Sequence, residues 1–262
     1  MTMTLLTGEQ RAAFDDLGWL VVRGVLDAAR VAELARALDE LVPESAYAGG
    51  YGGQVLEIPS ISRGSPALAT NAHDRRLARL AAEALGTRRL RLFQDTVFIK
   101  PAGDGARVAW HQDYSYFAFL DRPAALTVRV ALTPCTRESG ALRVIDGSHR
   151  WGLQGADLSF RAATVEDALG ALPPALREAA RDRQTLVELA PGDVSLHHCL
   201  TFHGSAANGS AGPRKTLAVR FVDGEVRVVA GRLPSPELAA YFPTDADGRL
   251  ADASFPLLVD GD

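Results

Sequence analysis

The sequence has 262 residues, of which 47% are hydrophobic and 23% charged, as is ordinary for a globular protein with one sizeable core. A net charge of −4, without basic runs that contain aromatic residues, argues against a nucleic-acid partner. No apolar run reaches the roughly 18 residues of a membrane span, and residues 1–7 do not resemble a signal peptide. We therefore expect one cytoplasmic domain over residues 1–262, as a monomer or a weak homodimer.

The first predicted element is a helix that begins after Thr7. Thr7 and Gln10 have the spacing of a capping box, and Gly18 is a typical residue at the end of a helix. The apolar residues 19–25 then predict a short strand.

Two more helices are predicted before Arg89, where the apolar period changes. Asp27 caps a run in which apolar residues from Val31 to Val42 recur at helical spacing, and residues 74–85 form another such run, ended by Gly86. These amphipathic stripes predict helices that pack on a core.

Residues 44–66 lack a clear period. Four glycines surround Tyr51 and two prolines follow, and a long irregular segment of this kind is either a functional lid or a packed connector. In the first case, Tyr51 could contact a substrate.

From Arg89 onward the apolar period changes to two, which is typical of strands. Strands are expected at 89–100, 107–114, 124–132, 141–145, 185–189, 194–203, 215–223 and 225–230. Many short strands after several helices predict a mainly β fold with flanking α-helices: a double-stranded β-helix, the jelly roll of cupins, with N-terminal and inserted helices outside it.

An insertion at residues 152–182 separates two of these strands. Helices are expected within it at 165–171 and 174–181. It is either a second candidate lid over the mouth of the barrel or a helical pair that packs outside.

His111 and Asp113 lie two residues apart in a segment predicted to be extended. Alternate side chains of a strand point to the same face, so one metal ion could bind both. His203, from a later strand, would complete a set of two histidines and one carboxylate. Such a set leaves positions open on a non-haem iron.

Arg214 follows His203 by eleven residues, beyond a short loop rich in Gly, Ser and Asn. A hairpin there would place Arg214 on a strand next to His203, where its guanidinium suits a carboxylate. An acidic co-substrate is implied. Thr216, two residues later, would face the same side and could add a hydroxyl group.

Other polar residues of the strands could also enter the site. Gln94, Lys100, Thr127 and Arg129 face either inward, toward a co-substrate or substrate, or outward into solvent. Strand alternation places His197 on the His203 face, so His197 is an alternative metal ligand.

Five ordered segments carry a resemblance to a known family. They are Leu6–Val25, Trp110–Asp113, Glu138–Arg150, Pro191–Asp193 and His203–Ser205, the last followed by Arg214. Together they resemble the phytanoyl-CoA dioxygenase-like branch of the iron(II)/2-oxoglutarate oxygenases. The resemblance implies iron ligation by His111, Asp113 and His203, an anchoring role for Arg214 at the distal carboxylate of 2-oxoglutarate, and the double-stranded β-helix fold. Asp146 departs from the family, which more often has proline there.

The resemblance implies an enzyme that uses dioxygen and 2-oxoglutarate to oxidise a small molecule, most simply by hydroxylating an unactivated C–H bond. Desaturation, cyclisation and epimerisation remain alternatives, as does a cupin-type protein that binds a metal for non-oxidative chemistry. Halogenation is disfavoured because Asp113 supplies the carboxylate that halogenating relatives lack. Phe117 and Phe119, with Tyr51, are the candidate substrate contacts.

Overall fold

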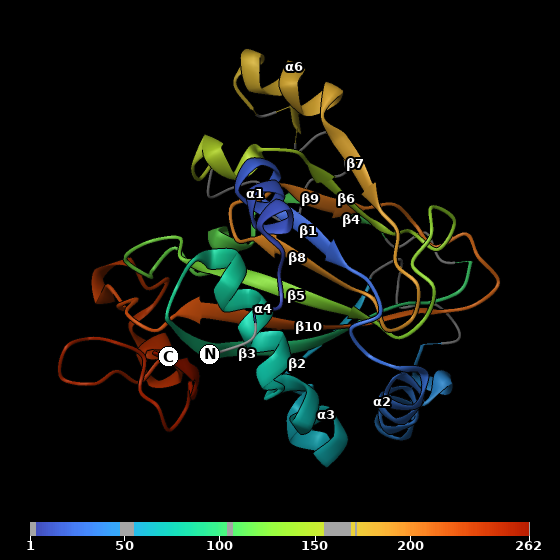
Figure 1. The fold of residues 1–262 in the computed structure, drawn as a ribbon, viewed down its shortest axis with the longest axis horizontal. Helices are drawn as coiled ribbons and strands as arrows, with labels where there is room; N and C mark the ends of the chain where they lie inside the picture. Colours follow the sequence, from blue (N-terminus) through green and yellow to red (C-terminus); the bar gives the residue numbers. More distant parts are fainter. Residues whose placement is uncertain (1–3, 48–54, 104–106, 155–168, 171, 262) are drawn as a thin grey trace.

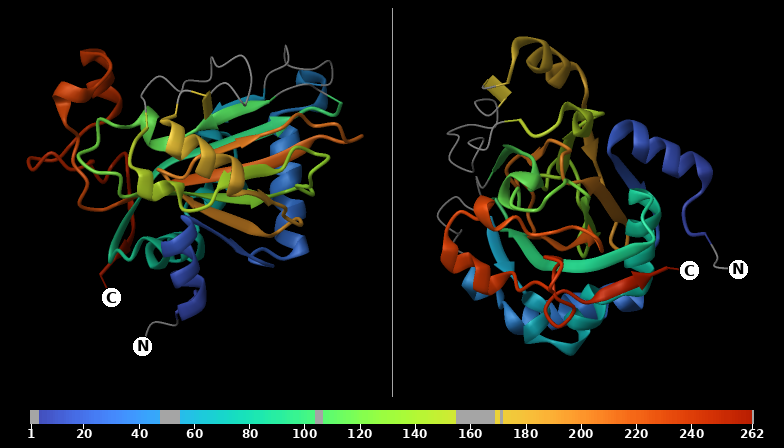
Figure 2. Two further views of the ribbon diagram at one scale, coloured as in Figure 1. Left: turned by 90° about the horizontal axis from the view of Figure 1, so that it is seen from above. Right: turned by 90° about the vertical axis from the view of Figure 1, so that its left-hand side faces the viewer.

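The computed structural model describes residues 4–47, 55–103, 107–154, 169–170 and 172–261. Its strands form two antiparallel sheets that face each other (Figures 1 and 2). The larger sheet has the order β1 (Trp19–Val22), β8 (Val194–His198), β5 (Ala125–Ala131), β10 (Arg214–Asp223), β3 (Arg89–Lys100) and β11 (Leu257–Asp260), with β2 (Leu56–Pro59) also paired to β3. The smaller sheet has the order β4 (Val108–His111), β9 (His203–Ser205), β6 (Leu142–Ile145) and β7 (Gln184–Val187). The jelly-roll architecture predicted from the sequence is confirmed.

The helices flank this barrel. They are α1 (Gly8–Leu17), α2 (Ala28–Leu41), α3 (Pro66–Ala72), α4 (Arg75–Leu85) and α6 (Pro174–Asp182). The predicted capping box of Thr7 and Gln10 is present, and Gly18 ends α1 in the left-handed conformation, with φ of 78°. Helices α2, α3 and α4 cover the outer face of the larger sheet, whereas α6 lies beside β7 (Figure 1).

Strand β5 shows how the larger sheet separates core from cavity. Leu126, Val128 and Val130 belong to the apolar cluster under the helices. Thr127 and Arg129 alternate with them and therefore face the inside of the barrel. The inward orientation considered for these two residues is thus observed.

Two predicted strands are shorter than expected. The segment 107–114 is extended only as far as His111, and Asp113 begins a 3₁₀ turn, η3 (Asp113–Tyr116). The segment 194–203 divides into β8 and β9, which belong to different sheets, because the chain turns at residues 199–202 and crosses the barrel.

The predicted hairpin between His203 and Arg214 is wrong. Strand β9 belongs to the smaller sheet, and Arg214 lies on β10 of the larger sheet, opposite Lys100 of β3. Residues 225–230 also form no named strand; Arg227 and Val228 make only isolated bridges. Periodicity shows that a segment is extended, but does not identify its partner.

The two candidate lids are only partly described. Residues 55–66 contain β2, a 3₁₀ turn, η2 (Ile61–Gly64), and the start of α3, whereas Tyr51 lies outside the described residues. In the insertion, α6 confirms the second predicted helix, and most of the first, 165–171, lies outside the described residues. In the part of the chain that the structure describes, no helix is long and apolar enough to cross a membrane.

Gly192 connects the start of β8 to the N-terminal segment. Its N–H donates to the carbonyl of Ala131 at 2.9 Å, and its own carbonyl accepts from the N–H of Leu26 at 3.0 Å. Its φ is 88°, and a Cβ at this position would lie 2.3 Å from the Leu26 carbonyl oxygen. Only glycine fits here without strain.

We expect Gly192→Ala to lower the free energy of unfolding by about 2 to 3 kcal/mol, because it adds a backbone clash to a left-handed conformation. Urea denaturation measures the change. Gly212→Ala is the matched control, since a Cβ there meets nothing within 4 Å. Equal stabilities of the two variants would contradict this account.

Candidate metal centre

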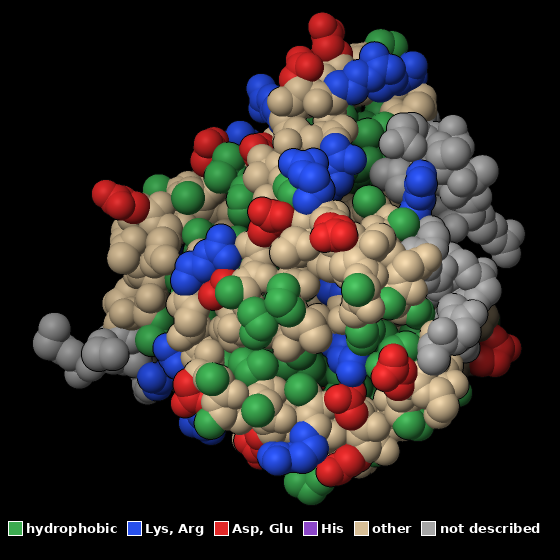
Figure 3. All heavy atoms as spheres, turned by 90° about the vertical axis from the view of Figure 1, so that its right-hand side faces the viewer, with side chains coloured by type: hydrophobic (Ala, Val, Ile, Leu, Met, Phe, Trp, Pro, Cys, Tyr) green, Lys and Arg blue, Asp and Glu red, His purple; other side chains and the backbone are tan. Residues whose placement is uncertain are grey.

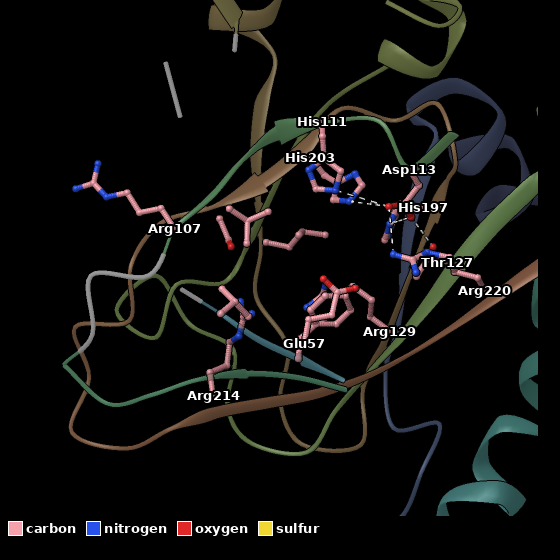
Figure 4. A pocket seen from close by; sticks show the side chains of 15 residues that line it. Glu57, Arg107, His111, Asp113, Thr127, Arg129, His197, His203, Arg214 and Arg220 are labelled. Atoms are coloured by element: carbon pink, nitrogen blue, oxygen red, sulfur yellow. Dashed lines mark hydrogen bonds and ion pairs between the residues drawn. The ribbon is translucent and has the colours of Figure 1, made fainter. Parts of the chain in front are cut away.

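Three buried side chains converge at one end of the barrel interior (Figure 4). His111 comes from the end of β4, His203 from the start of β9, and Asp113 from the turn after β4. Asp113 Oδ1 lies 3.7 Å from His111 Nε2 and 3.6 Å from His203 Nε2. Two ligands at about 2.1 Å from one ion lie at most about 4.2 Å apart, so these atoms fit a shared metal. The three form the metal-capable group identified among the described residues.

Backbone contacts orient both imidazoles. His111 Nδ1 lies 2.9 Å from the carbonyl oxygen of Ala109, and His203 Nδ1 lies 2.9 Å from that of Thr201. A carbonyl can only accept, so each Nδ1 carries the proton and each Nε2 presents its lone pair to the site. Burial, followed by the neighbouring His111, lowers the pKa of His203 well below its usual value, which keeps this ring neutral.

The two oxygens of Asp113 have different partners. Oδ1 faces the histidines, whereas Oδ2 accepts a hydrogen bond of 2.7 Å from Thr127 Oγ1. Arg220 Nη2 lies 3.5 Å from Oδ1. Burial opposes ionisation of Asp113, but Arg220 and the surrounding imidazoles outweigh it and hold its pKa well below the usual value. Asp113 is therefore an anion with one oxygen directed at the metal position.

His197 lies beside this carboxylate rather than in the ligand group. Its Nε2 is 3.4 Å from Asp113 Oδ2, the oxygen that also binds Thr127. His197 is 1% exposed, and this burial lowers the pKa of its imidazole, so the ring is neutral. The alternative role of His197 as a metal ligand does not fit this placement, because it contacts the oxygen that points away from the other two histidines.

A cavity of about 500 Å³ opens from the metal position. This volume accommodates a small organic molecule. The charged residues that line it are Glu57, Arg107, Asp113, Arg129, Arg214 and Arg220. Arg129 and Arg214 lie across the cavity from the three candidate ligands (Figure 4).

The two arginines on that far side are buried and form no ion pair with a carboxylate of the described residues. Arg129 donates from Nη2 to Thr216 Oγ1 at 2.9 Å and lies over the ring of Phe98. Arg214 donates from Nη1 to the carbonyl of Gly140, and its buried Nε has no hydrogen-bond partner among the described residues. Burial, with Arg129 nearby, lowers the pKa of Arg214 to about 10. Two buried guanidiniums arranged in this way could hold an anion.

The remaining predicted cofactor contacts, Gln94, Lys100 and Thr216, are not among the described residues that line the cavity. Lys100 is fully buried and donates from Nζ to the carbonyl of Ala206. Gln94 accepts a hydrogen bond from Arg220 Nη1 at 2.5 Å. Thr216, already engaged by Arg129, supports that arginine from the neighbouring strand. Of the four residues considered for inward positions, Thr127 and Arg129 line the cavity.

Phe117 and Phe119 pack in an aromatic cluster rather than along the cavity. Phe117 lies edge-on to Phe93 at 5.4 Å between centroids, and Phe119 contacts Phe242 at 4.5 Å. Both are nearly fully buried there. Their predicted contact with substrate therefore does not match this placement, because the turn after Asp113 directs them into the C-terminal cluster.

Arg220 and Glu57 were missed by the sequence reasoning. Arg220 lies in the alternating strand 215–223, and its inward face follows from that of Arg214 and Thr216 by counting in twos. Glu57 belongs to the irregular segment, where no period indicates a direction. The strand periodicity therefore indicates the direction of the Arg220 side chain, whereas the sequence contains no such signal for Glu57.

The fold and this three-residue centre define a class, the jelly-roll non-haem metal oxygenases. The family model of phytanoyl-CoA dioxygenase (PhyH) matches residues 14–216. The chain belongs to this family of iron(II)/2-oxoglutarate-dependent dioxygenases.

The individual relatives differ in reaction. Ectoine dioxygenase of Sphingopyxis alaskensis is 29% identical over 252 residues, covering 88% of this chain and 79% of its own. The crystal structure of EctD from S. alaskensis with 2-oxoglutarate and 5-hydroxyectoine gives a TM-score of 0.73 at 26% identity, over 96% of this chain and 89% of that one. The 2-oxoglutarate-dependent epimerase SnoN from nogalamycin biosynthesis gives 0.75 at 27% identity, over 95% and 97%.

Thr127→Val should weaken metal binding by about 10- to 100-fold, because it removes the donor that orients Asp113 while keeping the side chain's volume. Titration with Co(II), followed by visible absorption, measures the affinity. Thr127→Ser should restore it. Thr96→Val is the control, since the Thr96 hydroxyl is buried on the neighbouring part of the sheet without a partner among the described residues. An unchanged affinity of Thr127→Val for Co(II) would show that the hydrogen bond from Thr127 to Asp113 Oδ2 does not support metal binding.

Proposed function

We propose that this protein hydroxylates an unactivated C–H bond of a small organic substrate, with iron(II) held by His111, Asp113 and His203. When bound, the iron couples oxidation of the C–H bond to decarboxylation of the co-substrate: R–H + 2-oxoglutarate + O₂ → R–OH + succinate + CO₂. The observation that carries the proposal is that one cavity contains both this centre and two buried arginines, Arg129 and Arg214, that form no ion pair with a carboxylate of the described residues.

The arginines suit the distal carboxylate of 2-oxoglutarate. Arg214 offers its unpartnered Nε, and Arg129, fixed by Thr216, adds a second positive charge. The keto-acid end would then reach the metal across the cavity. Because both guanidiniums are buried, water is excluded from the ion pair, which strengthens it.

The three ligand side chains suit an iron(II) ion that keeps free coordination positions. Two imidazoles and one carboxylate would hold the ion from one side and would leave coordination positions for co-substrate and dioxygen. Thr127 donates a hydrogen bond to the second oxygen of Asp113, which leaves Oδ1 to face the metal position. In this proposal, the residues of the chain bind the metal and orient the co-substrate. The walls of the cavity determine which C–H bond of the substrate reacts.

Epimerisation is the second candidate reaction. The similarity to SnoN covers nearly the whole of both chains and supports it. Mass spectrometry after turnover under ¹⁸O₂ separates the two reactions, because hydroxylation adds one labelled oxygen to the product and epimerisation adds none.

Substituting a proposed ligand tests the centre itself. We expect His111→Ala and Asp113→Ala to lose iron(II) binding and succinate formation, while circular dichroism shows that both variants remain folded, since the site lies at the end of the barrel. His73→Ala, an exposed histidine, is the control. Either ligand variant with full iron binding would contradict the assignment.

Arg214→Ala tests the co-substrate site separately. Binding of 2-oxoglutarate to the Mn(II)-loaded protein should weaken by about 2 to 5 kcal/mol, because a desolvated ion pair is lost, while Mn(II) affinity changes little. Isothermal titration calorimetry gives both constants. Arg107→Ala removes the same charge from an exposed residue of the cavity lining and serves as control. Equal effects of the two substitutions would place the anchor elsewhere.

A further inference from the structure

A row of four polar residues crosses the inner face of the larger sheet beneath Asp113. Arg220 of β10 pairs with Gln94 of β3 on one side and with Thr127 of β5 on the other, and Thr127 pairs with His197 of β8. The register of β10 against β3 shifts between Arg220 and Phe221. Arg220 is thus the last residue of the regular stretch of β10, in which every second residue from Arg214 faces the barrel interior.

The three guanidinium nitrogens of Arg220 differ in their contacts. Nη1 is bonded to Gln94, which carries no charge, and the buried Nε has no hydrogen-bond partner among the described residues. The charged contact in the described structure is Nη2 to Asp113 Oδ1, at 3.5 Å. Arg220 therefore depends for its charge compensation on the same oxygen that faces the two histidines.

A divalent ion on Oδ1 would remove that compensation. The ion would draw on the charge of the carboxylate and repel the guanidinium, which would leave Arg220 to turn toward the cavity that it already lines. Asp113 would keep its orientation without Arg220, because Thr127 donates a hydrogen bond to Oδ2. Metal loading would thus turn Arg220 from an internal ion-pair partner into a largely buried cation without charge compensation in the cavity wall.

We propose that Arg220 is the binding site for an anionic group of the substrate, so that the enzyme oxidises a carboxylic acid or a comparable organic anion. This inference rests on the proposed function. It gives Arg220 a role distinct from that of Arg129 and Arg214, which lie on the far side of the cavity (Figure 4).

The charge of the whole cavity supports an acidic substrate. Four arginines and two carboxylates line it. A divalent metal and the 2-oxoglutarate dianion cancel each other, so two positive charges remain in the loaded site. By contrast, acidic and basic side chains are interspersed on the outer face shown in Figure 3. A cavity with excess positive charge and low-dielectric walls concentrates anions.

The experiment uses protein loaded with Mn(II) and 2-oxoglutarate, which holds the site without turnover. Three acids are compared with their own amides by calorimetry: benzoate, cyclohexanecarboxylate and octanoate. We expect at least one acid to bind about tenfold more tightly than its amide, as a charged hydrogen bond predicts. Arg220→Gln should abolish this preference, and Arg220→Lys should keep part of it. In metal-free protein, Arg220→Gln should not alter the affinity for the acid.

A second measurement does not need a substrate. Because Arg220 competes with the ion for Oδ1, Arg220→Gln should bind Mn(II) at least about threefold more tightly than native protein. Arg143→Gln makes the same change of charge on the smaller sheet, outside the cavity lining, and should have no effect. Melting temperatures show that each variant is folded.

The outcomes separate the possible sources of the anion. Equal affinity for acids and amides, or a preference that survives in Arg220→Gln, overturns the proposal. If Arg220→Gln instead weakens the binding of 2-oxoglutarate by about tenfold, Arg220 binds a carboxylate of the co-substrate, and its assignment to the substrate is wrong. Failure of native Mn(II) protein to bind 2-oxoglutarate at all would instead overturn the proposed function.

Discussion

The site depends on one buried carboxylate, Asp113, held between two sheets. Removing this anion from water costs several kcal/mol unless charged and hydrogen-bonding partners compensate it. Arg220 and Thr127 supply that compensation from the larger sheet, while His111 and His203 approach from the smaller one. The barrel must close for these groups to meet, so the fold and the electrostatics of the site are coupled.

The two sheets have different tasks. The smaller sheet and the turn after it provide the candidate metal ligands, with Nδ1 of each histidine fixed by a backbone carbonyl. The larger sheet provides the positively charged and hydroxyl groups that line the cavity: Arg129, Arg214 and Arg220, in addition to Thr127. Thr127, Arg129 and Arg220 alternate along their strands with apolar residues that pack under the helices, whereas Arg214 is followed by Lys215, which is bonded to Asp39 of α2. Burial on one face therefore fixes which polar residues reach the cavity on the other.

Local signals in the sequence predicted local structure well. The caps of α1, α2 and α4 and the extent of β3 follow from residues that interact within a few positions, and the three candidate ligands were identified by type and spacing. Strand partners were harder, because the turn at residues 199–202 sends the chain to another sheet without a change of period. Asp146 shows the same limit: it replaces a common proline, and its carboxylate binds Trp19 Nε1 and Thr185 Oγ1, contacts between distant segments that no local pattern contains.

Relatives that cover most of this chain include a dioxygenase and an epimerase, although they share one fold and one co-substrate. The metal ligands alone therefore do not determine the outcome of the reaction; the placement of the substrate over the open face of the metal must do so. In this chain, Arg220 Nη2 lies 3.5 Å from Asp113 Oδ1, the oxygen that faces His111 and His203. If Arg220 binds an anionic substrate, as we propose, it would fix one end of that molecule, and the distance from that end to the metal would decide which C–H bond is oxidised.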